Sequence, residues 1–231
     1  MAEPTISVVI PAYRAAKTIT RAIDSVLAQT VPVSEIIVID DGSPDDQASV
    51  IERYGQPVIL HRQANSKTAA ARNAGIELAT GEFIAFLDAD DHWEPEKLER
   101  QLAVFEAHPE IGVVGSRYYQ QVPGESREVS KAKVDSWCDQ VRHEQGALAF
   151  QLGTMLWTGT VVVRKTALND ERFVSGLEPA EDRDMWIRLA STSAVYVLSQ
   201  PLATAVLTEG SISRSEIALD CNQMLKVVQR H

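Results

Sequence analysis

The chain has few of the residues and motifs that mark several common protein classes. Its 231 residues include only two cysteines, Cys138 and Cys221, and no CxxC pair. This excludes a zinc cage and argues against a disulfide framework. The sequence contains neither GxGxxG nor GxxxxGK, so it has no dinucleotide fingerprint and no P-loop. No stretch approaches the roughly 20 apolar residues of a membrane span.

Positive charge is also scarce. The chain has 22 lysines and arginines against 32 aspartates and glutamates, which gives a net charge of −10. Binding to nucleic acid requires a basic face, so we expect no nucleic-acid partner. The N-terminus carries Glu3 where a secretory signal has basic residues. We therefore expect a cytoplasmic protein without a transmembrane segment, and peripheral contact with a membrane stays open.

The first half of the sequence alternates apolar runs with helical periodicity. Expected strands are Ile6–Ile10, Glu35–Asp40, Val58–His61, Phe83–Leu87 and Ile111–Ser116, and expected helices are Ala16–Gln29, Ala48–Tyr54, Thr68–Ala79 and Pro95–Ala107. Strands that alternate with helices of ten or more residues predict an α/β fold with a doubly wound, mainly parallel sheet.

The pattern becomes less regular after about residue 120. We expect a polar loop or lobe junction at Gln120–Lys133, helical structure at Asp135–Gln151, a strand at Thr160–Arg164, a loop at Asn169–Pro179, a helix at Ala180–Ser191, a strand at Val195–Leu198, extended or loop structure at Val206–Ser213 and a helix ending near Gln229. The length suits one large domain, or two unequal lobes around a continuous sheet.

Three apolar strands end in polar or turn residues: Pro11-Ala12-Tyr13, Asp40-Asp41-Gly42-Ser43 and Asp88-Ala89-Asp90-Asp91. Ligands of open parallel sheets bind beyond the carboxyl ends of the strands. Alternation along an extended chain places Asp88 and Asp90 on one side and Asp91 on the other. Two convergent carboxylates can hold a divalent cation and, through it, a diphosphate. The alternatives are a tight turn with a helix cap at the second strand end and simple strand-end acids at the third.

A second acidic cluster, Glu181 to Asp184, opens the helix at 180–191. Asp182 precedes Met185 and Trp186 by three and four residues, so it heads the apolar stripe and points inward. A carboxylate held there is a candidate general base. Glu181 suits a favourable interaction with the helix dipole, and Asp184 suits a solvated pair with Arg188.

Other polar residues have both a functional and a structural interpretation. Arg72 and Asn73 offer a cation and an amide, or only surface polarity on their helix. Ser211, Ser213 and Arg214 can grip phosphate oxygens, or cap the last helix. The tryptophans that can stack on a sugar ring or pack in the core are Trp93, Trp137 and Trp157.

Four segments, in this order and spacing, resemble the family 2 glycosyltransferases: SVVIPAYRAAKTITRAIDSVLAQT, EIIVIDDGSPDD, ARNAGIELATGEFIAFLDADD and EDRDMWIRLA. The likeness is close over residues 5–115 and looser over 155–215. It implies a Rossmann-like, A-type glycosyltransferase fold, with a mainly parallel mixed sheet flanked by helices. It further implies an inverting transfer from a nucleotide-diphospho-sugar, most commonly a UDP-sugar, with Mn²⁺ or Mg²⁺. Residues 1–119 would form the donor-binding half of one domain and residues 120–231 the acceptor-binding half.

The resemblance also implies a role for each matching residue. The nucleobase and ribose would be lined by Pro11, Ala12, Tyr13 and Asp40, and Arg72 would lie beside the nucleotide. The DxD motif would be Asp88, Ala89 and Asp90, with Asp90 and Asp88 at the metal. Asp182 would be the general base, and Ser211 and Arg214 would cover the diphosphate. Many family members have glycine where this chain has Lys67, which puts the donor loop in question. The QxxRW motif of processive synthases is absent, so addition of a single sugar is expected.

Three other functions stay open from the sequence. A sugar nucleotidyltransferase shares the parallel sheet and the carboxylate-held magnesium, but the first strand is followed by PAYRAAKT, which has no glycine to hold a triphosphate. A receiver-type module also has acids at strand ends, but it lacks the half that carries Asp182. A transferase-like module that binds donor without turnover is the third alternative. The acceptor can be a glycan, a lipid-linked glycan or a small molecule.

Overall fold

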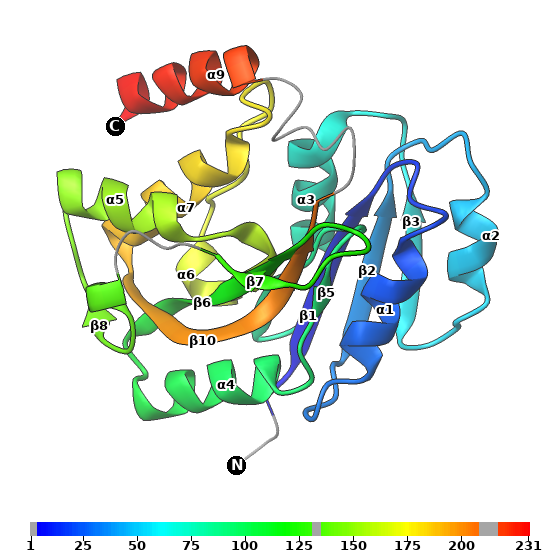
Figure 1. The fold of residues 1–231 in the computed structure, drawn as a ribbon, viewed down its shortest axis with the longest axis horizontal. Helices are drawn as coiled ribbons and strands as arrows, with labels where there is room; N and C mark the ends of the chain where they lie inside the picture. The colour runs from blue at the N-terminus through cyan, green and yellow to red at the C-terminus, as the bar shows by residue number, and fades with distance from the viewer. Residues whose placement is uncertain (1–3, 131–134, 208–216) are drawn as a thin grey trace.

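The computed structural model describes residues 4–130, 135–207 and 217–231 (Figure 1). Its strands are β1 (Ile6–Ala12), β2 (Glu35–Asp40), β3 (Val58–Arg62), β4 (Phe83–Phe86), β5 (His92–Trp93), β6 (Ile111–Gln121), β7 (Glu128–Val129), β8 (Val141–Arg142), β9 (Val162–Arg164) and β10 (Ala194–Val206). Its helices are α1 (Ile19–Leu27), α2 (Gln47–Glu52), α3 (Lys67–Leu78), α4 (Lys97–Ala107), α5 (Ala147–Met155), α6 (Lys165–Leu168), α7 (Glu181–Thr192) and α9 (Ile217–Arg230), with 3-10 helices η1 (Asp135–Trp137) and η2 (Thr158–Thr160).

The strands form one mixed sheet in the order β3-β2-β1-β4-β9-β6-β10-β5, with β7 beside β6 and β8 beside β10. Strands β1, β2, β3, β4, β6 and β10 share one direction, because β9 runs antiparallel to both β4 and β6. The expected mainly parallel α/β sheet is confirmed. The neighbours β2, β1 and β4 end at the same edge, so the three polar strand ends meet there.

The strands β1, β2 and β4 are buried on both faces, whereas the edge strand β3 is partly exposed. In β1, Val8 and Ile10 pack on the side of α1, α2 and α4, whereas Val9 packs on the side of α3 and α7. Alternation along the strand explains this division. Figure 1 shows α4 on one side of β6 and β10, with α5 and α7 on the other.

Two strands extend beyond the apolar runs that predicted them. β6 continues past Ser116 to Gln121 and β10 continues past Leu198 to Val206, because the two strands pair with each other along this length, with register shifts. The predicted loop at 120–133 contains β7, which pairs with β6. The segment 135–151 was expected to be helical, but it contains β8 between η1 and α5.

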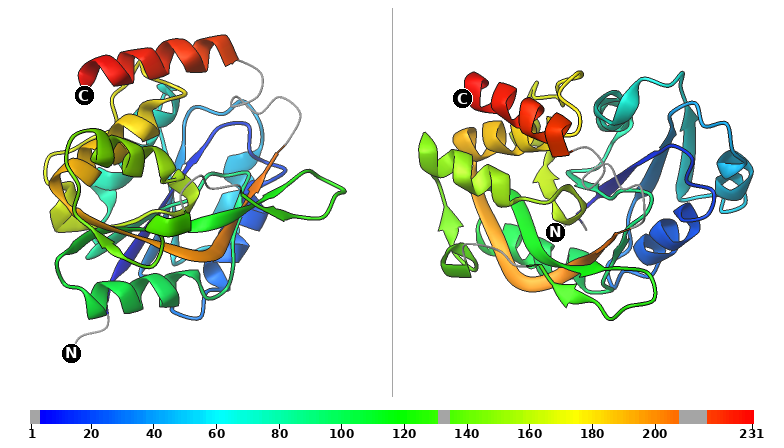
Figure 2. Two further views of the ribbon diagram at one scale, coloured as in Figure 1. Left: turned by 60° about the vertical axis from the view of Figure 1, so that its left-hand side comes forward. Right: turned by 45° about the horizontal axis from the view of Figure 1, so that its top comes forward.

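The last helix, α9, lies beside α7 (Figure 2). Val227 of α9 packs with Ile187 of α7. Arg230 and His231 both contact the buried carboxylate of Asp184. Among the described residues, no helix has both the length and the apolar character needed to cross a membrane.

Candidate active site

The guanidinium of Arg72 joins the two halves of the chain. This side chain is only 4% exposed on α3. Its Nη1 donates to Glu181 Oε1 at 2.8 Å, and its Nη2 donates to Asp88 Oδ1 at 2.8 Å. The interpretation of Arg72 as surface polarity is therefore wrong. Because α3 packs against β1 and β2, the guanidinium points from the sheet toward the start of α7.

The next residue of α3, Asn73, also holds the second half. Its Nδ2 donates to the carbonyl of Phe173, and the Phe173 N–H donates to Asn73 Oδ1, both at 2.9 Å. The guanidinium of Arg72 lies 5.3 Å from the centre of the Phe173 ring. Asn73 is therefore a structural anchor, and not the surface polarity that its position suggested.

The Arg72 cation faces more negative charge than it can balance. Burial disfavours the charged form of Arg72, but Asp88, Glu181 and Asp182 together raise its pKa. Burial and, to a smaller extent, the charge of Asp182 raise the pKa of Glu181 to about 7, against the opposing effect of Arg72. Glu181 is therefore more than a partner of the helix dipole.

Asp184 is not part of a solvated pair. Its carboxylate is fully buried and accepts hydrogen bonds from Arg188 Nε at 2.9 Å and from Arg230 Nε at 2.8 Å. Arg188 also forms an ion pair with Glu171. The sequence pattern of α7 could not show this, because the covering cation belongs to α9, 46 residues later.

The three acids after β4 lie in a turn. The strand ends at Phe86, and the Asp91 N–H donates to the Asp88 carbonyl at 3.1 Å. The alternation argument therefore does not apply beyond Leu87. Asp91 is buried and accepts the Val206 N–H at 2.8 Å, whereas Asp88 faces Arg72. Burial, and then the charge of Asp88, raises the pKa of Asp90, with Arg21 opposing.

The acids after β2 fix the neighbouring loops. The buried Asp40 accepts the Ser43 N–H at 3.0 Å and Gln47 Nε2 at 2.7 Å. Its Oδ2 lies 3.3 Å from Arg62 Nε. The tight-turn interpretation of this strand end therefore describes its structure.

Asp41 caps the helix that carries Arg72. Its carboxylate accepts the N–H groups of Ser66 and Lys67, both at 2.8 Å. Gly42 approaches Asn65 so closely that an added Cβ would lie 2.8 Å from the Asn65 nitrogen. Lys67 has a φ of 69°, in the left-handed region that favours glycine. The loop therefore keeps the backbone conformation of a glycine although it carries lysine.

The end of β1 is the open part of this edge. Ala12 is buried, and its carbonyl accepts the Asp41 N–H at 3.0 Å and Gln47 Nε2 at 3.2 Å. Tyr13 is 47% exposed, and the guanidinium of Arg14 lies 5.3 Å from its ring centre. Pro11 is half-buried. An exposed aromatic ring beside a strand end can stack on a planar ligand.

Asp182 opens α7 with a half-buried side chain. Its Oδ2 accepts a hydrogen bond from Thr158 Oγ1 at 3.0 Å. Trp186 Nε1 donates to the same Thr158 oxygen at 3.1 Å. No sequence signal pointed to Thr158, because it lies in η2 outside the motifs that were recognised. The predicted site residues Ser211 and Arg214 lie outside the described residues.

Trp93 has the core role expected of a tryptophan, because it is buried and its Nε1 donates to the Gly159 carbonyl at 2.8 Å. Trp157 is half-buried, and the centre of its ring lies 4.4 Å from the centre of the Tyr118 ring. The guanidinium of Arg142 lies 4.8 Å from the Trp137 ring centre.

The residues present fit a divalent cation that completes its coordination with the donor. No group of three or more His, Cys, Asp or Glu side chains that could hold a metal occurs in the described part of the chain. Asp88 and Asp90 supply two carboxylates, and Mg²⁺ commonly takes one or two carboxylates together with substrate phosphates. Burial, and then the charge of Asp88, raises the pKa of Asp90, and a bound cation would favour its ionised form.

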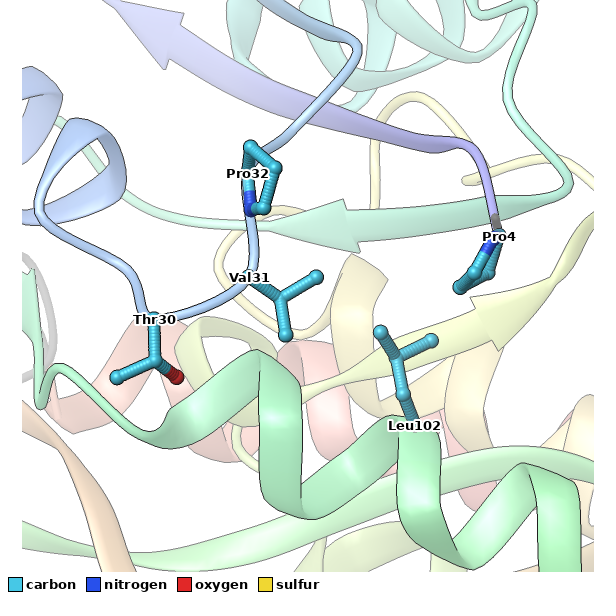
Figure 3. A pocket seen from close by; sticks show the side chains of 5 residues that line it. All are labelled: Pro4, Thr30, Val31, Pro32 and Leu102. Atoms are coloured by element: carbon cyan, nitrogen blue, oxygen red, sulfur yellow. The ribbon is translucent and has the colours of Figure 1, made fainter. Parts of the chain in front are cut away.

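A separate surface pocket lies away from this site (Figure 3). Pro4, Val31, Pro32, Thr30 and Leu102 line it. Pro4 precedes β1 and Pro32 precedes β2, so the pocket lies near the amino ends of the strands. It has no charged side chain and is opposite the edge where the acids gather.

The sequence matches the model of the family described as Glycosyl transferase family 2 over residues 7–171. AmsB, an amylovoran biosynthesis glycosyltransferase from Erwinia amylovora, is 34% identical over 211 residues, which cover 88% of this chain and 70% of AmsB. The fold, the acid-lined edge and this likeness define the class as a glycosyltransferase enzyme of A-type fold. The chain belongs to glycosyl transferase family 2.

Solved structures agree with this assignment. Crystalline TarS 1-349 from S. aureus superimposes with a TM-score of 0.71 at 26% identity, covering 87% of this chain and 60% of that chain. The same fragment in complex with UDP gives a TM-score of 0.71 at 25% identity, covering 88% and 61%. The chain also spans only 35% of a Nostoc relative, an uncharacterized glycosyltransferase that is 46% identical over 113 residues.

Proposed function

We propose that this protein transfers a single sugar from a UDP-sugar to an acceptor hydroxyl, with inversion and with the help of Mn²⁺ or Mg²⁺. The observation that carries the proposal is the bridge from Asp88 through Arg72 to Glu181. It ties the acids after β4 to the start of α7, where Asp182 lies. A donor site and a general base are thereby held at one edge of the sheet.

In this proposal the donor lies across the ends of β1, β2 and β4. Pro11, Ala12, Tyr13 and Asp40 line the base and ribose, while Arg72, Ala89, Ser211 and Arg214 belong to the donor site. Asp90 and Asp88 would hold the cation, which would offset the charge of the leaving diphosphate. Arg72 keeps Asp88 oriented, and its own cation limits repulsion between the acids and the diphosphate.

Asp182 acts as the general base. It takes the proton of the acceptor hydroxyl as that oxygen attacks the anomeric carbon from the face opposite the leaving group. General-base assistance contributes a factor on the order of 10²–10⁴. The direction of attack makes the transfer inverting.

The relatives suggest the class of acceptor. AmsB is named for amylovoran biosynthesis, and TuaG of Bacillus subtilis, which is 38% identical over 104 residues, is named as a putative teichuronic acid biosynthesis glycosyltransferase. We propose a growing polysaccharide or its lipid-linked precursor as acceptor, reached in the cytoplasm or at the membrane periphery. Residues 1–119 would bind the donor and residues 120–231 the acceptor. Family membership removes the nucleotidyltransferase and receiver-type alternatives.

A nucleotide-sugar panel tests the proposal. Release of the nucleoside diphosphate is measured for UDP-, GDP- and dTDP-activated sugars with Mn²⁺, with Mg²⁺ and with EDTA. We expect turnover with a UDP-sugar that EDTA abolishes. Turnover that survives EDTA would contradict the metal role, and preference for another nucleotide would contradict UDP. Binding of UDP and Mn²⁺ without any turnover would support the inactive-module alternative.

A further inference from the structure

We propose that Thr158 is a positioning residue that orients Asp182 through a hydrogen-bond relay from Trp186. The inference rests on the proposed function, because it takes Asp182 to be the general base. The relay runs from Trp186 Nε1 to Thr158 Oγ1 at 3.1 Å, and from Thr158 Oγ1 to Asp182 Oδ2 at 3.0 Å.

The chemistry of the three groups fixes the direction of each proton. An indole N–H can only donate, so Thr158 Oγ1 must accept from Trp186. The hydroxyl has a single proton, and an ionised carboxylate can only accept, so that proton points at Asp182. Asp182 Oδ1 accepts the Arg183 N–H at 2.7 Å and keeps lone pairs for the proton of an incoming hydroxyl.

Trp186, the first residue of the relay, is held in place by its aromatic neighbours. Trp186 is fully buried, and its ring lies 5.6 Å from Phe86 and 5.5 Å from Phe173, in edge-to-face contacts. Phe86 is the last residue of β4, two residues before Asp88. Through Trp186 and Thr158, the side chain of Asp182 is therefore positioned relative to β4, the strand that precedes Asp88 and Asp90.

The 3-10 helix that carries Thr158 is anchored from α4 and β5. Trp93 Nε1 donates to the Gly159 carbonyl, and Gln101 Nε2 donates to the Thr160 carbonyl at 2.7 Å. The fully buried Lys97 donates to Gln101 Oε1 at 2.8 Å, which orients the Gln101 amide. These buried polar side chains explain how η2 holds Thr158 in place.

Other charged groups lie near Asp182, so the test must separate their effects from those of the relay. Arg72 from α3 interacts with Asp182, and so does Glu181 beside it. Arg183 follows Asp182 on α7 and lies near Tyr118 of β6. Substitution of Glu181 by glutamine distinguishes its titration from that of Asp182.

A readout that needs no substrate is the pH dependence of the Trp186 indole N–H resonance in the intact chain, assigned with Trp186→Phe. We expect this resonance to move with pH in the wild type and in Glu181→Gln. It should stay fixed when Asp182→Asn or Thr158→Val is added in the Glu181→Gln background. Movement that persists with Thr158→Val in that background, or no movement in the wild type, would overturn the relay.

The kinetic test uses the fastest donor of the nucleotide-sugar panel. Thr158→Val should lower kcat about tenfold to hundredfold, the rate equivalent of one hydrogen bond to a charged group, with KM for the donor little changed. The acidic limb of its pH–rate profile should move to higher pH, because the carboxylate loses a donor. Thr158→Ser should restore both.

The matched control is Thr160→Val, which removes another buried hydroxyl of η2, one that donates to the Trp157 carbonyl at 2.7 Å. It should lose stability as Thr158→Val does but keep the wild-type pH profile. An identical profile in Thr158→Val would overturn the relay while leaving the proposed function intact. Full activity of Asp182→Asn would instead overturn the proposed function.

Discussion

Arg72 and Glu181 form a buried ion pair at 2.8 Å between helices that begin 114 residues apart in the sequence, Lys67 for α3 and Glu181 for α7. The same guanidinium holds Asp88 at 2.8 Å. One cation therefore sets the distance between the acids after β4 and the helix that carries Asp182. The proposed catalytic geometry depends on a contact that no single motif contains.

Removal of this cation should destabilise the fold. Arg72→Met leaves Asp88 and Glu181 without their buried partner, and loss of one member of a buried pair costs about 3 kcal/mol or more. Urea denaturation gives the free energy of unfolding. The control is Arg100→Met, which breaks an exposed ion pair with Glu96. It should change the free energy of unfolding by about 0.5 kcal/mol or less. Equal effects of the two substitutions would contradict the structural role of Arg72.

The raised pKa of Glu181 predicts a pH dependence of stability. Between its ordinary pKa of 4.5 and the folded value of about 7, the folded chain binds more protons than the unfolded chain, so this group lowers stability as pH rises. Glu181→Gln should therefore match the wild type near pH 4.5 and exceed it at pH 8, by on the order of 1–3 kcal/mol. Parallel unfolding curves at both pH values would show that Glu181 is not perturbed.

Lys67 predicts a stabilising substitution in the donor loop. Its φ of 69° is strained for a side chain, so Lys67→Gly should raise the free energy of unfolding by about 1 kcal/mol. Lys67→Ala keeps the Cβ and should give no such gain. The two variants can be compared by thermal unfolding. A gain in the alanine variant would assign the effect to the lysine charge and not to the backbone.

The sequence predicted the parallel core well because its central strands are buried on both faces. β2 has the predicted bounds, and the acids at the ends of β2 and β4 meet at one edge. Strand extensions were missed where pairing, and not apolar content, defines them, as in β6 beyond Ser116.

Partners distant in sequence explain the rest of the differences at the site. Arg72 looked like a surface residue because its two acidic partners lie 16 and 109 residues away. Asp184 looked solvated because the helix that covers it, α9, is distant along the sequence. Thr158 had no sequence signal, since its contacts with Asp182 and Trp186 exist only in the folded chain.

The central claim is that Asp90 holds the cation for donor binding whereas Asp182 acts as the general base. Calorimetric titration of UDP with and without Mn²⁺, paired with transfer assays, tests it most directly. The account predicts that the wild type and Asp182→Asn bind UDP more tightly with Mn²⁺, that Asp90→Ala loses this gain, and that Asp182→Asn loses a factor on the order of 10²–10⁴ in transfer. Mn²⁺-enhanced UDP binding in Asp90→Ala, or wild-type transfer by Asp182→Asn, would contradict it.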